Sequence, residues 1–195
     1  MNEESDEKRM LDLIRAGDAT GFDLMVESYG PMLYRYAVRM CGDVTEAEDT
    51  LQDTFLTAQE KIGQFRGEGR LRNWLFRIAG NSCLQKHRSR QGQKAELRLD
   101  DVLPAAEGLI NQEPSKWQLK PDEQMLSAEL SEKLERAIAR VPPTNRSVLI
   151  LRDVEGLNTR ETAEALEITE ETVKVRLHRA RAYVRNLLKD YFEED

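Results

Sequence analysis

Apolar residues recur at intervals of three and four along most of the chain, which is the spacing of amphipathic helices. Over residues 1–92 these repeats form several successive helices, separated by short stretches that contain glycine, proline and aspartate. One of these breaks contains Pro31, so we expect a helix to start there. Thr45 is expected to cap the following helix, and a basic helix is expected over residues 71–90. The pattern predicts one compact helical domain.

The periodic pattern stops over residues 93–123, where prolines, glycines and scattered acids replace it. Within that stretch, residues 95–123 hold seven acids and three bases, which is typical of an acidic flexible linker. The periodicity returns over residues 124–195 and predicts a second small domain of short helices followed by one long helix. The predicted fold class is therefore all-α, with two small helical domains joined by a flexible linker.

The second domain carries the pattern of a helix-turn-helix. Asn158 and Glu161 form a capping box for a short helix, and Thr169 caps a longer one after a tight turn. If Glu167 in that turn is left-handed, it costs on the order of 1 kcal/mol relative to glycine. We expect one face of the longer helix to point outward and contact DNA: Thr172, Lys174, Val175, Arg176, His178, Arg179 and Arg181. A plain helical hairpin with a solvated basic face is the alternative.

Net charge argues against a nucleic-acid partner, but the distribution of charge favours one. The chain carries a formal net charge of −7. Residues 64–90 nevertheless hold seven bases and one acid, and residues 172–185 hold five bases and no acid. Two basic segments in two domains of an acidic chain indicate two contacts with a polyanion.

Other classes of chemistry have little support in the sequence. Cys41 and Cys83 are far apart in the sequence and lack metal-ligand spacing, so we expect two reduced, buried thiols. No nucleophile–base pair, metal-ligand cluster or phosphate-binding loop is visible, which predicts a protein that is not an enzyme and has neither metal nor cofactor. No apolar stretch approaches the roughly 20 residues of a membrane span, and the acidic N-terminus does not read as a signal peptide. A cytoplasmic protein without membrane insertion is expected.

The motifs of both domains resemble the extracytoplasmic-function (ECF) sigma factors of bacterial RNA polymerase. Region 4 of that family is similar to RDVEGLN at 152–158 and TVKVRLHRAR at 172–181. Region 2 is similar to AEDTLQDTF at 47–55, FRG at 65–67 and WLFRIAGN at 74–81. The entry to region 4 resembles PDE at 121–123. The resemblance covers about 160 residues in the family's own order, with only the linker outside it.

This resemblance implies roles for three groups of residues. The surface that docks on the clamp helices of the polymerase β′ subunit matches Asp49, Gln52, Asp53 and Phe55, although Phe55 fits an ordinary helix core equally well. The reader of the minus-ten promoter element matches Arg66, Arg70, Arg72, Asn81, Lys86 and Arg88. The reader of the minus-thirty-five element matches five residues of the outward face of the long helix: Thr172, Lys174, Val175, Arg176 and Arg179.

The resemblance also implies partners and leaves one competing function. The expected partners are core RNA polymerase, through its β′ clamp helices and β flap, promoter DNA and an anti-sigma factor. The competing hypothesis is a stand-alone helix-turn-helix regulator that binds DNA as a dimer, which leaves the basic segment of the first domain unexplained.

Overall fold

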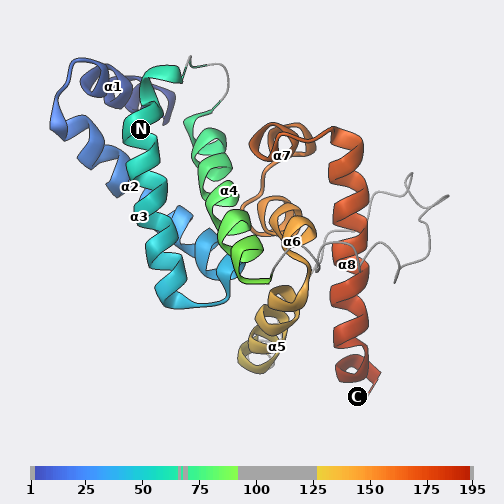
Figure 1. The fold of residues 1–195 in the computed structure, drawn as a ribbon. Helices are drawn as coiled ribbons and strands as arrows, with labels where there is room; N and C mark the ends of the chain where they lie inside the picture. The colour runs from blue at the N-terminus through green and yellow to red at the C-terminus, as the bar shows by residue number, and fades with distance from the viewer. Residues whose placement is uncertain (1–2, 66, 68–69, 92–126, 194–195) are drawn as a thin grey trace. The chain divides into compact units, whose positions relative to one another are not determined.

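The computed structural model agrees with the all-α prediction. Every regular element among the residues that it describes is helical (Figure 1). The chain divides into two compact units, Met1–Lys86 and His87–Asp195, which we call the N-terminal and C-terminal units. The described residues are 3–65, 67, 70–91 and 127–193. The predicted linker and the candidate Arg66 lie outside them.

Four α-helices build the N-terminal unit. They are α1 (Glu3–Arg15), α2 (Ala19–Cys41), α3 (Val44–Lys61) and α4 (Leu71–Gln91), with a 3₁₀ turn at Ile62–Gln64 after α3. Helix α2 packs against both α1 and α3. Tyr36 of α2 meets Phe76 of α4 edge to face, with 5.1 Å between ring centroids. Both rings are fully buried, so this contact lies at the centre of the unit's core.

The helix start predicted at Pro31 is wrong, because α2 runs unbroken through that residue. Proline removes one backbone N–H and crowds the carbonyl four residues earlier, which usually breaks a helix. Pro31 is exposed, so water can reach the affected turn. The opposite face buries Met25, Leu33 and Tyr36, on both sides of the proline. Tertiary packing therefore outweighs the local preference for a break.

The cap of α3 also lies two residues earlier than predicted. Asp43, not Thr45, is the N-cap, and its Oδ1 accepts the backbone N–H of Glu46 at 2.9 Å. Gly42 turns the chain with a φ of 73°, and Asp43 is extended. Thr45 already lies inside the first helical turn, where its hydroxyl is not in the capping position.

The C-terminal unit is a small bundle assembled on one long helix. Its elements are α5 (Ser127–Arg140), α6 (Pro143–Leu149), the π-helical η3 (Ile150–Val154), α7 (Thr159–Leu166) and α8 (Glu170–Glu193). Helices α5, α6 and α7 all pack on α8. Buried Arg146 closes the end of α5, because its guanidinium donates to the carbonyls of Val141, at 2.9 Å, and Ala139.

The turn chemistry predicted for this unit is confirmed. Asn158 and Glu161 form a reciprocal capping box at the start of α7. The hydroxyl of Thr169 accepts the N–H of Thr172 at 3.2 Å and so caps α8. Glu167 ends α7 in the left-handed region, with φ 54° and ψ 43°. Short helices joined by such caps fix the angle at which α8 leaves the turn.

Candidate nucleic-acid interface

Helix α8 presents most of its predicted contact residues outward. Its apolar stripe is buried: Val173, Leu177, Ala180 and Val184. On the other face Lys174 is exposed. Five further predicted residues are half-buried: Thr172, Val175, Arg176, His178 and Arg179. The result is a helix with a dry side and a basic side, which is the form that enters a major groove.

Arg181 departs from the predicted arrangement. It is only 8% exposed, and its Nε and Nη2 donate to the two carboxylate oxygens of Asp153 at 2.8 and 2.6 Å. Asp153 belongs to the π-helical segment, where the wider helical turn interrupts the α-helical register. The expectation that Arg181 points outward is therefore wrong, because a carboxylate distant in sequence draws it into the unit.

The start of α8 carries negative charge. Glu170 and Glu171 are both exposed in the first turn. The pKa of Glu171 is lowered by a hydrogen bond from its own backbone N–H, by the side chain of Thr169 and by the charge of Lys174. Its carboxylate therefore stays ionised and interacts favourably with the helix N-terminus. Because this charge repels phosphate, the basic residues further along α8 are better placed to contact DNA.

Helix α1 contacts Phe65 and Leu71, the residues that flank the predicted minus-ten residues Arg66 and Arg70 in the sequence. Arg15 donates from Nη2 to the carbonyl of Phe65 at 3.4 Å. Glu7 accepts the backbone N–H of Leu71, the first residue of α4, at 3.3 Å. A carboxylate at that position also complements the helix dipole. Sequence reasoning missed this role of Glu7, because nothing in the local pattern around it indicates a partner 64 residues away.

The predicted minus-ten residues occupy different environments. Arg70, Asn81 and Arg88 are exposed, and Arg72 is half-buried. Lys86 is half-buried, and its Nζ lies 2.7 Å from a carboxylate oxygen of Asp53. A residue predicted to contact DNA thus pairs with one predicted to contact the polymerase.

The predicted polymerase-docking residues on α3 are mostly exposed. Asp49, Gln52 and Asp53 all face solvent. Phe55 is only 8% exposed and meets Phe22 of α2 edge to face, with 6.1 Å between ring centroids. The burial of Phe55 supports the helix-core interpretation, and the same residue also lines the groove described next.

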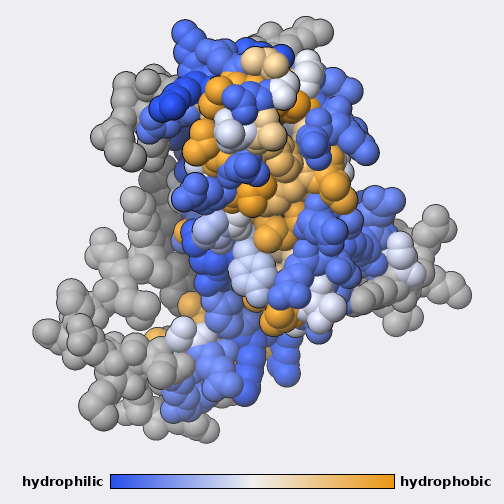
Figure 2. Space-filling model, turned by 90° about the vertical axis from the view of Figure 1, so that its left-hand side faces the viewer, coloured by the Kyte–Doolittle hydropathy of each residue, from blue (hydrophilic) through white to orange (hydrophobic). Residues whose placement is uncertain are grey.

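An apolar groove between α2 and α3 adjoins these residues. Figure 2 shows apolar side chains gathered on this side of the N-terminal unit. The groove is lined by Phe22, Val26, Gly30 and Tyr34 from α2 and by Glu48, Leu51, Gln52, Phe55 and Leu56 from α3. Leu56 is 53% exposed and Val26 40% exposed, which is unusual for large aliphatic residues this close together. Sequence reasoning did not predict this groove. The signal that could have indicated it is Leu56, an aliphatic residue on the polar face of its helix.

Within residues 3–65, 67, 70–91 and 127–193, no group of three or more potential ligands could hold a metal ion. None of the helices in that part of the chain is long and apolar enough to cross a membrane.

Comparison with known proteins gives the family. The family described as Sigma-70 region 2 matches residues 25–93, and Sigma-70, region 4 matches residues 131–184. The ECF RNA polymerase sigma factor SigW of Bacillus subtilis is 32% identical, covering 94% of this chain and 97% of the relative. This chain belongs to the ECF family of RNA polymerase sigma factors. The RNA polymerase sigma-H factor of Pseudomonas aeruginosa is 29% identical, covering 96% of each chain.

Solved structures show the same fold as this ECF sigma factor. The sigma factor RpoE, solved in complex with the anti-sigma factor NepR from Bartonella quintana, is 25% identical and has a TM-score of 0.61. That alignment covers 86% of this chain and 96% of RpoE. CnrH, solved with the cytosolic domain of CnrY, is 22% identical and has a TM-score of 0.67, covering 95% and 98% of the two chains. These similarities support the function of a sigma factor over that of a stand-alone helix-turn-helix regulator.

Proposed function

We propose that this ECF sigma factor binds core RNA polymerase and brings it to promoter DNA through two separate readers. Residues 1–92 serve as region 2 and residues 124–195 as region 4, joined by residues 93–123. The two matched family segments, 25–93 and 131–184, support this division. The proposed activity is positioning and needs no catalytic group of its own, and it places the protein in the cytoplasm with the polymerase.

The apolar groove between α2 and α3 is the observation that carries the polymerase contact. A groove with exposed aliphatic residues beside the acidic and amide side chains of Asp49, Gln52 and Asp53 fits a protein partner better than DNA. Apolar contact supplies affinity at such a surface, while the surrounding charges select the partner. The β′ clamp helices are the proposed occupant, and Phe55 contributes as the floor of the groove. The proposed contact of region 4 is the β flap.

The proposed DNA contacts are the polar and basic residues of α8, of α4 and of the segment just before α4. In region 2 these are Arg66, Arg70, Arg72, Asn81, Lys86 and Arg88. In region 4 they are Thr172, Lys174, Val175, Arg176, His178 and Arg179, without Arg181, whose charge is already engaged by Asp153. Phosphate contacts from these bases give orientation, and base-edge contacts give sequence preference.

An anti-sigma factor is the proposed regulator. The similar sigma factor RpoE was solved with such an inhibitor, NepR. Two units that each carry a proposed DNA surface suit an inhibitor that covers both. Co-purification of the untagged native complex from the source cell tests this point.

One pair of matched variants tests the polymerase surface. Leu56→Asp puts a charge into the groove, whereas Val44→Asp puts the same charge on the same helix outside it. The two parent side chains are equally exposed, at 53% and 54%. We expect Leu56→Asp to weaken binding to purified core polymerase at least tenfold, about 1.4 kcal/mol. Val44→Asp should change binding by less than about twofold. Equal effects of the two variants would contradict the assignment of the groove.

Transcription from genomic DNA by the reconstituted holoenzyme tests the function as a whole. We expect a set of start sites that core polymerase alone does not use. Lys174→Ala should reduce their use without reducing core binding. A chain that neither binds core polymerase nor adds specific transcripts would refute the proposed function.

A further inference from the structure

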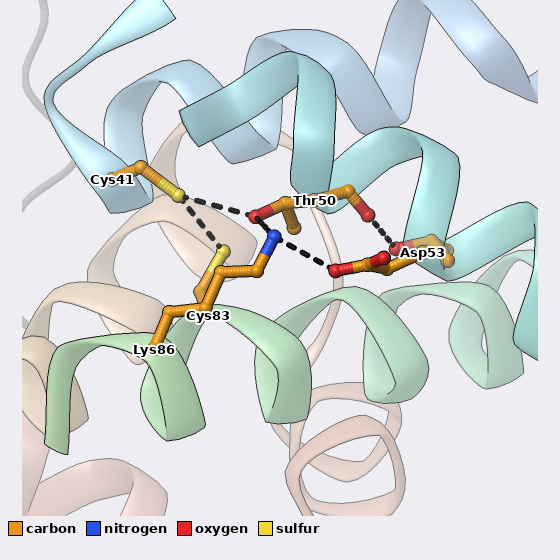
Figure 3. A network of polar contacts seen from close by, with 6 residues as sticks. Cys41, Thr50, Asp53, Cys83 and Lys86 are labelled. Carbon is orange, nitrogen blue, oxygen red and sulfur yellow. Dashed lines mark hydrogen bonds and ion pairs between the residues drawn. The ribbon is translucent and has the colours of Figure 1, made fainter. Parts of the chain in front are cut away.

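Two thiols that are distant in sequence meet inside the N-terminal unit. Cys41 is the last residue of α2, and Cys83 lies in α4. Their sulfur atoms are 3.3 Å apart, although 42 positions separate them in the chain. Figure 3 shows the two side chains pointing at each other. The expectation of two buried thiols holds for Cys83 but is wrong for Cys41, which is only half-buried. The contact between the two was not predicted.

We propose that Cys41 and Cys83 are a modification site that a hydroperoxide converts reversibly into a disulfide. A disulfide bond is about 2.05 Å long, so the two sulfurs must approach by roughly 1.3 Å. Side-chain rotation with small shifts of α2 and α4 supplies a movement of this size. The inference concerns the chemistry of this pair and goes beyond the proposed transcription function.

The surroundings give the two sulfurs different parts in the reaction. The pKa of Cys83 is raised by its hydrogen bond to Cys41 and by burial. Cys83 therefore keeps its proton to a higher pH than an ordinary thiol. Cys41 is the more accessible of the two, so it meets the oxidant first. Reactive cysteines are in general those that are accessible and stabilised as thiolate, and inert ones are buried.

Polar groups lie beside the two sulfurs. The hydroxyl of Thr50 lies 3.6 Å from the Cys41 sulfur. Lys86 donates to the same hydroxyl at 3.4 Å and lies 2.7 Å from Asp53 (Figure 3). A hydroxyl that accepts a hydrogen bond from an ammonium group can donate its own hydrogen toward a thiolate. The network thus places a hydroxyl and a positive charge beside both sulfurs, and at Cys83 these two groups lower the pKa against the larger opposing effects of Cys41 and burial. Accessibility therefore assigns the attack to Cys41.

The reaction balances with a hydroperoxide as the oxidant. The Cys41 thiolate attacks the terminal oxygen, the O–O bond breaks, and an alkoxide or hydroxide leaves and takes up a proton. The sulfenic acid at Cys41 is then attacked by the sulfur of Cys83. The S–S bond forms, the S–O bond breaks, and the hydroxide leaves as water with the Cys83 proton. Overall two thiols and one hydroperoxide give a disulfide, an alcohol or water, and one water. Two external thiols reverse the step by exchange and are oxidised to a disulfide themselves.

The full chain is suited to a direct test, because it contains only these two cysteines. The reduced protein is freed of reductant, exposed to a small molar excess of hydrogen peroxide and alkylated in denaturant. We expect an intact mass that has lost two hydrogen atoms and gained no alkyl group. A non-reducing digest should place the cross-link between Cys41 and Cys83, and dithiothreitol should restore both thiols. The cross-linked chain should melt on the order of 10 °C higher, because the bond closes a long loop in the unfolded state.

Two variants test which sulfur attacks the peroxide and which one then forms the disulfide. Cys83→Ser should stop at the sulfenic acid of Cys41, which a 1,3-diketone such as dimedone traps. In Cys41→Ser, the remaining Cys83 should react with peroxide at least tenfold more slowly than Cys41 does in Cys83→Ser. Far-UV circular dichroism of each variant confirms that it is folded, and the wild-type mass measurement stands without either.

Three results would overturn the inference. The first is a chain that keeps both thiols at peroxide levels that oxidise a small-molecule thiol. The second is a cross-link that forms no faster in the folded chain than in denaturant. The third is a disulfide that joins two chains instead of Cys41 to Cys83 of one chain.

Discussion

Replacing Asp153 by asparagine should destabilise the C-terminal unit strongly, although asparagine has almost the same shape. The carboxylate of Asp153 accepts two hydrogen bonds from Arg181, at 2.8 and 2.6 Å. The two side chains are only 20% and 10% exposed. Asp153→Asn therefore removes the carboxylate charge that faces a guanidinium mostly removed from water.

The expected loss follows from this burial. Breaking a buried ion pair by removing one partner costs about 3 to 5 kcal/mol. Because Asp153 is exposed as a whole residue, although its side chain is only 20% exposed, we place the cost at the lower end, about 3 kcal/mol. In a unit of this size that corresponds to a melting temperature lowered by on the order of 15 °C.

Hydrogen exchange of the full chain measures this loss where it occurs. Peptides from α6 and α8 should lose protection in Asp153→Asn, whereas peptides from α2 and α4 of the N-terminal unit serve as the internal reference. Lys174→Met is the matched control, because it removes an exposed cation from the same helix and should change stability by less than about 0.5 kcal/mol. The double variant Asp153→Leu with Arg181→Met should recover most of the loss, since an apolar pair can replace a buried ion pair.

The same measurement decides what Arg181 does. If Asp153→Asn is as stable as Lys174→Met, the ion pair between Asp153 and Arg181 does not stabilise the folded unit. The structural role of Arg181 is then wrong. In that case the original expectation of a DNA contact from Arg181 regains its support. If the loss is as large as expected, a defect of an Arg181 variant in transcription reports folding rather than promoter recognition.

Two further changes test the backbone features that the local sequence disfavours. Glu167→Gly should stabilise the C-terminal unit by about 1 kcal/mol, because φ is 54° there and glycine adopts this region without strain. Glu167→Ala removes the same side chain but keeps the strain, so equal stabilities of the two variants in urea unfolding would show that no strain is relieved. Pro31→Ala should stabilise the N-terminal unit by at least about 1 kcal/mol by restoring a helical N–H inside α2. A lower melting temperature for Pro31→Ala would mean that the ring itself makes a contact the helix needs.

The sequence predicts most of the fold because the signals that define a helix come from residues close together in the chain. Spacing of apolar residues and capping residues such as Asn158 and Thr169 depend on neighbours only a few positions away. Predictions failed where a distant surface decides. Pro31 and the residues beside it predict a helix break, because tyrosine-glycine-proline is a typical break sequence. Helix α2 nevertheless continues, because both of its halves bury apolar residues against α1 and α3.

The candidate site was predictable in composition but not in pairing. The basic side of α8 follows from its period, so the sequence predicts which face of the helix most of these residues occupy. Arg181 fits that period as well. It does not face outward, because it forms hydrogen bonds with Asp153, 28 residues earlier in the chain. The contact of Cys41 with Cys83 likewise depends on how α2 and α4 pack, which no spacing in the chain encodes. Leu56 was visible as an apolar residue on a polar face, but the groove also requires Val26 on the adjacent helix.

The ion pair between Lys86 and Asp53 connects the two surfaces that the proposed function keeps apart. Its side chains are 31% and 50% exposed, so the pair contributes about 1 kcal/mol or less to folding. A pair this weak is easily given up to a stronger partner. A DNA phosphate that takes Lys86 leaves Asp53 with its full negative charge, free to meet a basic residue of the polymerase. A polymerase residue that takes Asp53 frees Lys86 for phosphate in the same way. Each contact therefore removes the competitor of the other, and the coupling between them is limited to the energy of the pair, roughly fivefold in affinity.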